Sequence, residues 1–333
     1  MDGSVIRRYV RLTSVSCAVL LIACLASASG GPPRRQTVLF ARWRTGLMPM
    51  DADGTNVRLL TDQSRIAHGD WAPDGTSVVF ANNGAAFLTI MQYPDGPSRQ
   101  VFAPSGAVWA DVPRWSPDGV SIAFQAWAND RPDLYVADVA DWASRQVTRS
   151  RSYDEYPTWS ADGRQLAFHS DRDPAFWLPE VAAEDIYIVD ADGDNVQNVT
   201  QSKQRELWPS WSPDGRQIAF TRTWGPLSKT ELWILDLDTS RERQITGIPP
   251  LWTATWTPSG QRLLLTVFQD IPDRTDIAIV DADGSNFRRL MDTPDVESHP
   301  RMFDPAALSV SPASKATTTW GHVKALAEGD TVH

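Results

Sequence analysis

Five copies of a short motif, Trp-Ser-Pro-Asp-Gly or a close variant, constrain the fold of this chain more than any other feature. The copies begin at Trp71, Trp115, Trp159, Trp211 and Trp256 and are spaced 44, 44, 52 and 45 residues apart. Each copy is followed by a short apolar strand such as SVVFAN or QIAFTR, by a second such as IYIVD or LWILD, and by a third that ends near Thr or Leu. Four short strands in about 45 residues match the size of a β-propeller blade.

The strands of one repeat are named A to D here, with the motif tryptophan at the end of strand A. Pro-Asp-Gly then forms the A–B turn, because proline presets φ and glycine accepts a positive φ. A tryptophan recurring at this spacing is expected to pack between blades rather than to hold a ligand. The C–D turn recurs at Asp51–Asn56, Asp190–Asn195 and Asp281–Asn286. These hexapeptides supply too few oxygens for a calcium loop, so we interpret them as hairpin turns with a left-handed residue.

The two ends of the repeat region are incomplete in complementary ways. Val38–Arg42, Leu47–Asp51 and Val57–Thr61 resemble strands B, C and D with no strand A before them, and Pro300–Pro305 resembles a degenerate strand A with nothing after it. The last strand A is therefore expected to join the first three strands in one blade. The sequence predicts an all-β fold, a six-bladed β-propeller with four antiparallel strands per blade, whose ring is closed by N- and C-terminal strands in one blade.

The N-terminus has the pattern of an export signal, with three arginines between residues 7 and 11 and an apolar stretch at Leu12–Ala23 that is too short to span a bilayer comfortably. One interpretation is a lipobox, with cleavage before Cys24 and lipidation of that residue. The alternatives are cleavage after Ala28, which releases a soluble protein, and a retained membrane anchor. The expected organisation is a signal peptide at 1–23, a flexible linker at 24–37, the propeller at 38–305 and a C-terminal tail at 306–333. The expected location is outside the cytoplasm, as a membrane-anchored lipoprotein or a periplasmic or extracellular protein.

Composition excludes several classes of function. The net charge of −10 argues against a nucleic-acid partner, since a phosphate backbone needs a basic surface. Both cysteines, Cys17 and Cys24, lie in the export signal, so no disulfide or cysteine-based metal site is expected in the propeller. The sequence contains no GxSxG elbow, glycine-rich phosphate loop or HExxH motif, which favours a non-enzymatic role.

The motif followed by an IAF strand, together with IYIVDADGDNVQNVT at Ile186–Thr200, resembles the repeat of the TolB-type propeller. The resemblance covers about residues 38–305 and implies the propeller fold in an exported protein or lipoprotein. The same repeat resembles the propellers fused to prolyl-oligopeptidase-type serine peptidases. We expect neither the N-terminal α/β domain of TolB nor a peptidase domain, because the chain leaves no room for them.

Strand direction separates two faces of the expected propeller. The A–B and C–D turns share one face, called the turn face, and the D–A connections and B–C loops share the other, called the loop face. Variable loops on a rigid scaffold are the usual place for binding. The 52-residue repeat has a long B–C segment containing Phe176 and Trp177, and we expect Trp127 and Trp224 on other B–C loops. These aromatic residues either stack on a sugar or grip a peptide, or they belong to self-packed loops that cover a blade.

The position three residues before each strand-A tryptophan, or before its degenerate equivalent, is expected at the mouth of the central channel. It is occupied by His68, Val112, Tyr156, Trp208, Thr253 and His299. Asp111 and Glu206 are among the acidic residues nearby. Closure makes His68 and His299 neighbours, so one interpretation is a divalent metal site, as in a propeller-type polysaccharide lyase that this repeat class resembles. The other is an aromatic, acidic funnel with two ordinary histidines and no cofactor.

These features favour a non-enzymatic, envelope-associated scaffold that binds a protein, peptide or glycan on its loop face, with membrane contact only through a lipid at Cys24. The alternative is a carbohydrate-active hydrolase or lyase with its site in the axial funnel. The alternative requires three or more polar side chains that converge within about 3–4 Å of one point in the funnel.

Overall fold

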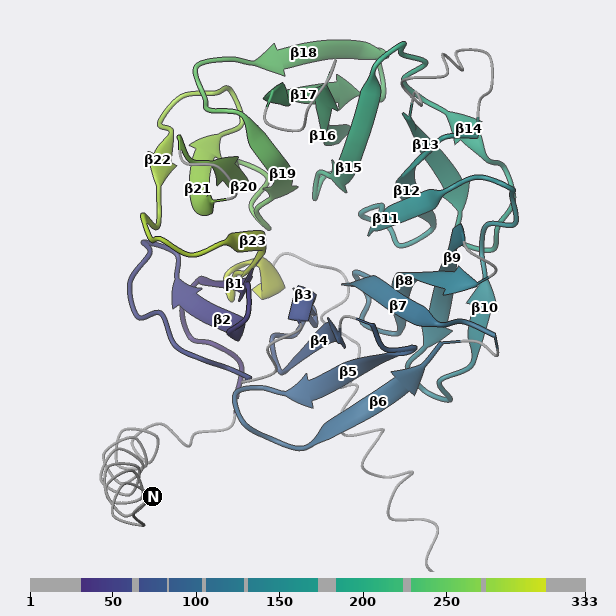
Figure 1. The fold of residues 1–333 in the computed structure, drawn as a ribbon, viewed down its shortest axis with the longest axis horizontal. Helices are drawn as coiled ribbons and strands as arrows, with labels where there is room; N and C mark the ends of the chain where they lie inside the picture. The colour runs from purple at the N-terminus through teal and green to yellow at the C-terminus, as the bar shows by residue number, and fades with distance from the viewer. Residues whose placement is uncertain are drawn as a thin grey trace, which may run out of the picture. The chain divides into compact units, whose positions relative to one another are not determined.

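The computed structural model describes residues 31–61, 66–82, 84–103, 106–128, 131–172, 184–223, 229–270 and 274–309. It shows six β-sheets arranged around a centre, with strand A of each sheet innermost (Figure 1). All neighbouring strands in these sheets are antiparallel. They are also consecutive along the chain, apart from the one pair that closes the ring. The predicted six-bladed propeller is therefore confirmed. Among the described residues, no helix combines the length and apolar character needed to cross a membrane.

The five complete blades follow one another along the chain. The first contains β3 (Ile66–Trp71), β4 (Ser77–Asn82), β5 (Phe87–Gln92) and β6 (Ser98–Phe102), and the second contains β7 (Trp109–Trp115), β8 (Ser121–Ala128), β9 (Arg131–Asp138) and β10 (Ser144–Gln146). The third contains β11 (Asp154–Trp159), β12 (Gln165–Ser170), β13 (Asp185–Asp190) and β14 (Gln197–Asn198). The fourth contains β15 (Arg205–Trp211), β16 (Gln217–Thr223), β17 (Glu231–Asp236) and β18 (Arg241–Ile245). The fifth contains β19 (Leu251–Trp256), β20 (Arg262–Phe268), β21 (Thr275–Asp281) and β22 (Arg288–Arg289).

The sixth blade joins both ends of the propeller, as predicted. Strand β23 (Glu297–Phe303) pairs with β1 (Thr37–Arg42), which pairs with β2 (Gly46–Asp51), and a short 3₁₀ helix, η3 (Ala307–Ser309), follows. The fourth strand, expected at Val57–Thr61, is reduced to a single bridge between Leu47 and Thr61 and two further hydrogen bonds to β2. Val57 and Leu59 are exposed there, so little apolar burial holds this edge in a regular ladder.

Apolar residues at repeated positions form the core between blades. The strand-B phenylalanines are almost fully buried, and they are Phe40, Phe80, Phe124, Phe168 and Phe220. Each motif tryptophan packs on the preceding blade; Trp211, for example, clusters with Ala167 and Ile188 of the third blade. This confirms the predicted structural role of the motif tryptophans, since their burial joins neighbouring sheets.

Both turns on the turn face satisfy their own polar groups. Gly75 of the first A–B turn has φ 69°, a left-handed conformation that the motif glycine adopts in all five copies. In the C–D turns, the Asn195 amide donates to Asp190 at 2.6 Å, and Asn195 has φ 55°. Equivalent hydrogen bonds join Asn56 to Asp51 and Asn286 to Asp281. These contacts confirm that the recurring acidic segments are hairpin turns.

Candidate binding site at the central channel

One local irregularity, repeated in every blade, aims side chains at the channel. The pairing between strands A and B shifts register within five residues before the tryptophan or its equivalent in all six blades, and strand A carries the extra residue. Four of the residues at or beside this bulge have positive φ, and these are Val112, Tyr156, Trp208 and His299. A bulge of this kind redirects a side chain out of the regular alternation. At four of the six blades, the residue three before the tryptophan or its equivalent lines one cavity, and these residues are Tyr156, Trp208, Thr253 and His299.

A hydrogen-bonded chain of three side chains joins the first three blades, with His68 of the first blade between Asp111 of the second and Tyr156 of the third. Asp111 accepts a hydrogen bond from Nδ1 of His68 at 2.7 Å, and Nε2 of His68 lies 3.4 Å from the hydroxyl of Tyr156. With Nδ1 of His68 carrying the proton toward Asp111, Nε2 accepts from the hydroxyl. Burial, followed by the charges of Asp111 and Glu155, raises the pKa of Tyr156 well above its ordinary value. Tyr156 is thus a proton donor and not a ready nucleophile.

His299 lies at the centre of the aromatic residues around the channel. Its ring is 4.0 Å from the ring of His68 and 5.5 Å from that of Trp252, measured between centroids. His299 is 7% exposed, and neither nitrogen of its ring has a hydrogen-bond partner among the described residues. Desolvation, followed by the neighbouring charges, lowers the pKa of His299 well below its ordinary value. The imidazole is therefore neutral near pH 7.

A second layer of side chains projects from the position one residue before each tryptophan or its equivalent. In three blades this residue accepts a hydrogen bond from a backbone N–H of the next blade; Asp70, for example, accepts from the N–H of Trp115 at 2.9 Å. The second and sixth blades carry Arg114 and Arg301 instead, on either side of the blade that contributes Asp70. Desolvation lowers the pKa of both arginines, that of Arg301 to about 9, which leaves Arg301 cationic at neutral pH.

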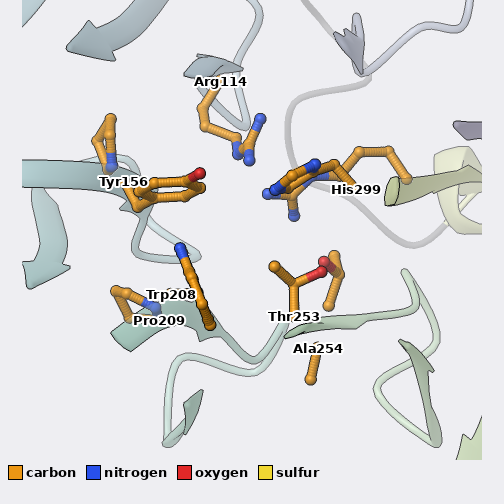
Figure 2. Close-up of a pocket in the computed structure, with 10 residues that line it drawn as sticks. Arg114, Tyr156, Trp208, Pro209, Thr253, Ala254 and His299 are labelled. Atoms are coloured by element: carbon orange, nitrogen blue, oxygen red, sulfur yellow. The ribbon is translucent and has the colours of Figure 1, made fainter. Parts of the chain in front are cut away.

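A small cavity lies between these two layers. It is lined by Arg114, Tyr156, Pro157, Trp208, Pro209, Thr253, Ala254, Thr255, His299 and Arg301. Figure 2 shows the guanidinium of Arg114, the hydroxyl of Tyr156 and the imidazole of His299 directed toward this space, with Trp208 and Thr253 along its other side. The free space at its centre accommodates about one water molecule, so the cavity fits a small polar group and not a sugar ring.

The structure brings together five of the ten residues predicted for ligand binding, and three of the others lie outside the described residues. His68, Asp111, Tyr156, Trp208 and His299 form one cluster around the channel, which we call the channel cluster. Glu206 is fully buried and forms a close ion pair with Arg222 of the neighbouring strand, so it does not line the cavity.

Trp127 was expected on a loop, but it lies inside β8, because the pairing of β8 with β9 continues to Ala128 and Arg131. It is stacked on Trp109 with 5.8 Å between ring centroids, and its ring edge meets Tyr153 at 5.8 Å. Phe176, Trp177, Trp224 and Cys24 lie outside the described residues, as do the expected signal peptide and most of the C-terminal tail.

The two arginines of the second layer are the site residues that the sequence interpretation missed. Arg114 and Arg301 occupy the position directly before the tryptophan or its equivalent, where the other blades have Asp, Thr or Ser. A comparison of that column across the six repeats would have singled them out. His169, expected to be structural, accepts a hydrogen bond from the N–H of Trp208 at 3.4 Å.

The metal interpretation finds little support in the geometry. Within the described ranges there is no group of three or more His, Cys, Asp or Glu side chains that could hold a metal ion. One nitrogen of His68 is committed to Asp111, and the nearest partners of His299 are aromatic rings. The two histidines thus fit the aromatic funnel better than a metal centre.

Comparison with known proteins agrees with this architecture. The family model described as the TolB beta propeller domain matches residues 39–177 and 178–314, which together cover most of the chain. The chain belongs to the TolB β-propeller family. A TolB homologue from Chlorobium luteolum is 31% identical over 192 residues, which are 56% of this chain and 38% of the relative. An uncharacterized peptidase of Bacillus subtilis, YuxL, is 32% identical over 123 residues, 34% of this chain and 17% of the relative.

Solved structures show the same fold. TolB from Acinetobacter baumannii has a TM-score of 0.67 at 20% identity, covering 91% of this chain and 73% of that chain. A chain of the nidogen/laminin complex has a TM-score of 0.65 at 11% identity, covering 81% and 99%. This TolB-family chain spans less than two fifths of the length of these curated relatives, so the family membership describes its propeller.

Proposed function

We propose that this TolB-family propeller is an exported, envelope-associated scaffold that binds a protein or peptide on its loop face, around the mouth of the central channel. One observation carries the proposal: four partly exposed aromatic side chains gather on this face, whereas the partly exposed Trp142 on the turn face has the guanidinium of Arg99 over its ring at 4.7 Å. The four on the loop face are Trp109 at the start of β7, Trp127 near the end of β8, Tyr153 just before β11, and Trp252 in β19. Each is on the loop face because strand A begins there and strand B ends there.

The aromatic residues of the loop face have unused bonding capacity. The indole N–H groups of Trp109, Trp127 and Trp252 are buried without a hydrogen-bond partner among the described residues. Aromatic side chains with an apolar body and a polar edge are enriched in protein interfaces and in their hot spots. On the turn face, the serine, aspartate and asparagine side chains bond within their own turns, although the indole N–H of Trp142 there also has no partner among the described residues.

The export part of the proposal rests on the first 28 residues and on the similarity to TolB proteins. A lipid at Cys24 would tether the propeller to a membrane through the linker at 24–37, and cleavage after Ala28 would release it. The intact mass of the protein purified from cells distinguishes the two. A mass consistent with a diacylated or triacylated N-terminal cysteine supports the lipoprotein, and an unmodified chain starting at Ser29 supports release.

The binding part is tested by comparing two variants on opposite faces. Trp127→Ala removes a loop-face aromatic, and Val120→Ala removes an exposed apolar side chain, 47% exposed, from an A–B turn on the turn face. Purified full-length proteins are crosslinked to an envelope fraction and the adducts are identified. We expect Trp127→Ala to lose an adduct that wild type and Val120→Ala retain, with thermal midpoints checked to exclude unfolding. Equal adducts from all three proteins, or loss only in Val120→Ala, would contradict the proposal.

A second candidate function, a carbohydrate-active lyase or hydrolase, is favoured by the chain from Asp111 through His68 to Tyr156. These three side chains are hydrogen-bonded in series, an arrangement that can pass a proton between a phenol and a carboxylate through the imidazole. The assay is incubation with envelope polysaccharides, reading new C=C absorbance for a lyase and new reducing ends for a hydrolase. Activity that disappears in Tyr156→Phe supports the enzyme, and no activity in wild type rejects it for those substrates.

A further inference from the structure

The second layer of the channel contains two desolvated arginines that form no direct ion pair. Arg114 is 5% exposed, and Arg301 is partly buried two blades away. Asp70 is the one carboxylate between them, and it also accepts the hydrogen bond from the N–H of Trp115. In the described part of the chain neither arginine is within ion-pair distance of a carboxylate. Asp111 of the channel cluster adds a second negative charge near Arg114, but it does not pair directly with the guanidinium. A desolvated guanidinium without a direct partner is unfavourable.

The same place holds donors without acceptors. Nε of Arg114 and Nε of Arg301 are buried and have no hydrogen-bond partner among the described residues, and the same is true of both nitrogens of His299. A neutral imidazole has one N–H, so His299 adds a third unpaired donor. All three residues line the one-water cavity, and Figure 2 shows Arg114 and His299 approaching it from different sides. Each unpaired buried donor costs stability that an acceptor in the cavity would recover.

We propose that the central channel binds a carboxylate group between Arg114 and Arg301, with the N–H of His299 as a further donor. A carboxylate supplies a negative charge and several acceptor positions, which matches the three unpaired donors. The planar guanidinium pairs with a planar carboxylate through parallel hydrogen bonds.

The carboxylate has two potential sources, a small free acid or the terminus of a peptide that enters the channel. The chemistry is the same in both, and the site does not depend on the partner bound at the rim of the loop face. Loss of carboxylate binding would therefore leave the proposed scaffold role standing, and failure to find a partner would leave the carboxylate site standing.

The test is a thermal-shift titration of the full-length protein with sodium acetate, at constant ionic strength and with sodium chloride and sodium phosphate as comparison salts. Arg301→Met removes the cation and keeps a similar length of side chain. Arg164→Met is the matched control, because Arg164 is a surface arginine with 85% of its side chain exposed. Arg301→Lys keeps the charge and loses the fork geometry.

We expect acetate to raise the midpoint of wild type and of Arg164→Met above the values in chloride and phosphate. The apparent affinity for acetate should fall about tenfold or more in Arg301→Met, because a charged hydrogen-bonded partner is lost, and Arg301→Lys should give a smaller shift than wild type. Without acetate, Arg301→Met should unfold at or above the wild-type temperature, since it removes an unpaired buried cation. An acetate shift no larger than that of the other salts, or one unchanged in Arg301→Met, overturns the proposal.

A second pair of ligands distinguishes the sources. N-acetylated triglycine with a free terminal carboxylate is compared with the same peptide ending in an amide. A shift with the free terminus alone, lost in Arg301→Met, assigns the site to a peptide carboxylate. A shift with acetate and with neither peptide assigns it to a small free acid.

Discussion

Gly75, in the first A–B turn, lies against the strand that closes the ring. A Cβ added at this position would meet three ring atoms of Phe303, the farthest of them 2.8 Å away. Gly163 occupies the same place in the third turn with nearly the same φ, 70° against 69°, but its nearest neighbour would be Pro117 at 3.7 Å. Gly75→Ala and Gly163→Ala thus share the backbone effect, and only Gly75→Ala adds a collision with β23.

The difference between the two variants isolates the contact across the closure. A left-handed residue with a Cβ costs about 1–2 kcal/mol in either turn. Overpacking typically costs a further ~1–3 kcal/mol, which applies at Gly75 alone, because real Cβ atoms do not approach a ring this closely. We therefore expect Gly75→Ala to lower the free energy of unfolding by ~1–3 kcal/mol more than Gly163→Ala.

The assay is urea denaturation of the full-length proteins followed by tryptophan fluorescence. Phe303→Leu completes a double-mutant cycle, because a smaller side chain on β23 makes room for the added methyl group. The cost of Gly75→Ala should therefore be smaller in the Phe303→Leu background than in wild type. Equal losses of stability in Gly75→Ala and Gly163→Ala would refute the reasoning and the packing of β23 against the first blade.

Three further predictions concern buried ionisable groups. The pKa of His299 is lowered on folding, so the unfolded chain takes up a proton that the folded chain does not. Relative to His299→Phe, the wild type should therefore lose stability in chemical denaturation as the pH falls from about 7 to 5. The pKa of Asp133 is raised to about 6, chiefly by desolvation and then by Asp154, so the folded chain keeps a proton that the unfolded chain releases. Relative to Asp133→Asn, the wild type should therefore lose stability as the pH rises from about 4 to 7. Arg222→Met should cost about 3–5 kcal/mol at pH 8 in the same assay, since it leaves Glu206 buried without its cation, and Glu206→Gln in the same background should recover part of the loss.

The repeat made the fold predictable because each motif reports the same local structure. Gly75 and its equivalents mark left-handed turns, and the motif tryptophans mark burial between blades. The degenerate strand at the C-terminal end was also recognisable, although Met302 stands where the other blades have tryptophan. Val57–Thr61 was the exception, since an exposed edge leaves the backbone less constrained than the sequence pattern suggests.

The site was only partly predictable, because its contacts join residues from different blades. The position three before the tryptophan identified His68, Tyr156 and His299, but the hydrogen bond of His68 to Asp111 depends on the bulge in each strand. The arginines of the second layer are hidden in a position whose usual role is to bond the next blade. Their burial, which gives them their chemical interest, follows from the closed ring and not from any local pattern.

The central claim, that partners bind the loop face around the channel, is tested most directly by photo-crosslinking in living cells. A photoreactive phenylalanine analogue is placed at Trp109 on the loop face in one protein and at Val120 on the turn face in another. We expect a specific protein adduct from position 109 and none from position 120. Adducts from position 120 alone would contradict binding at the loop face.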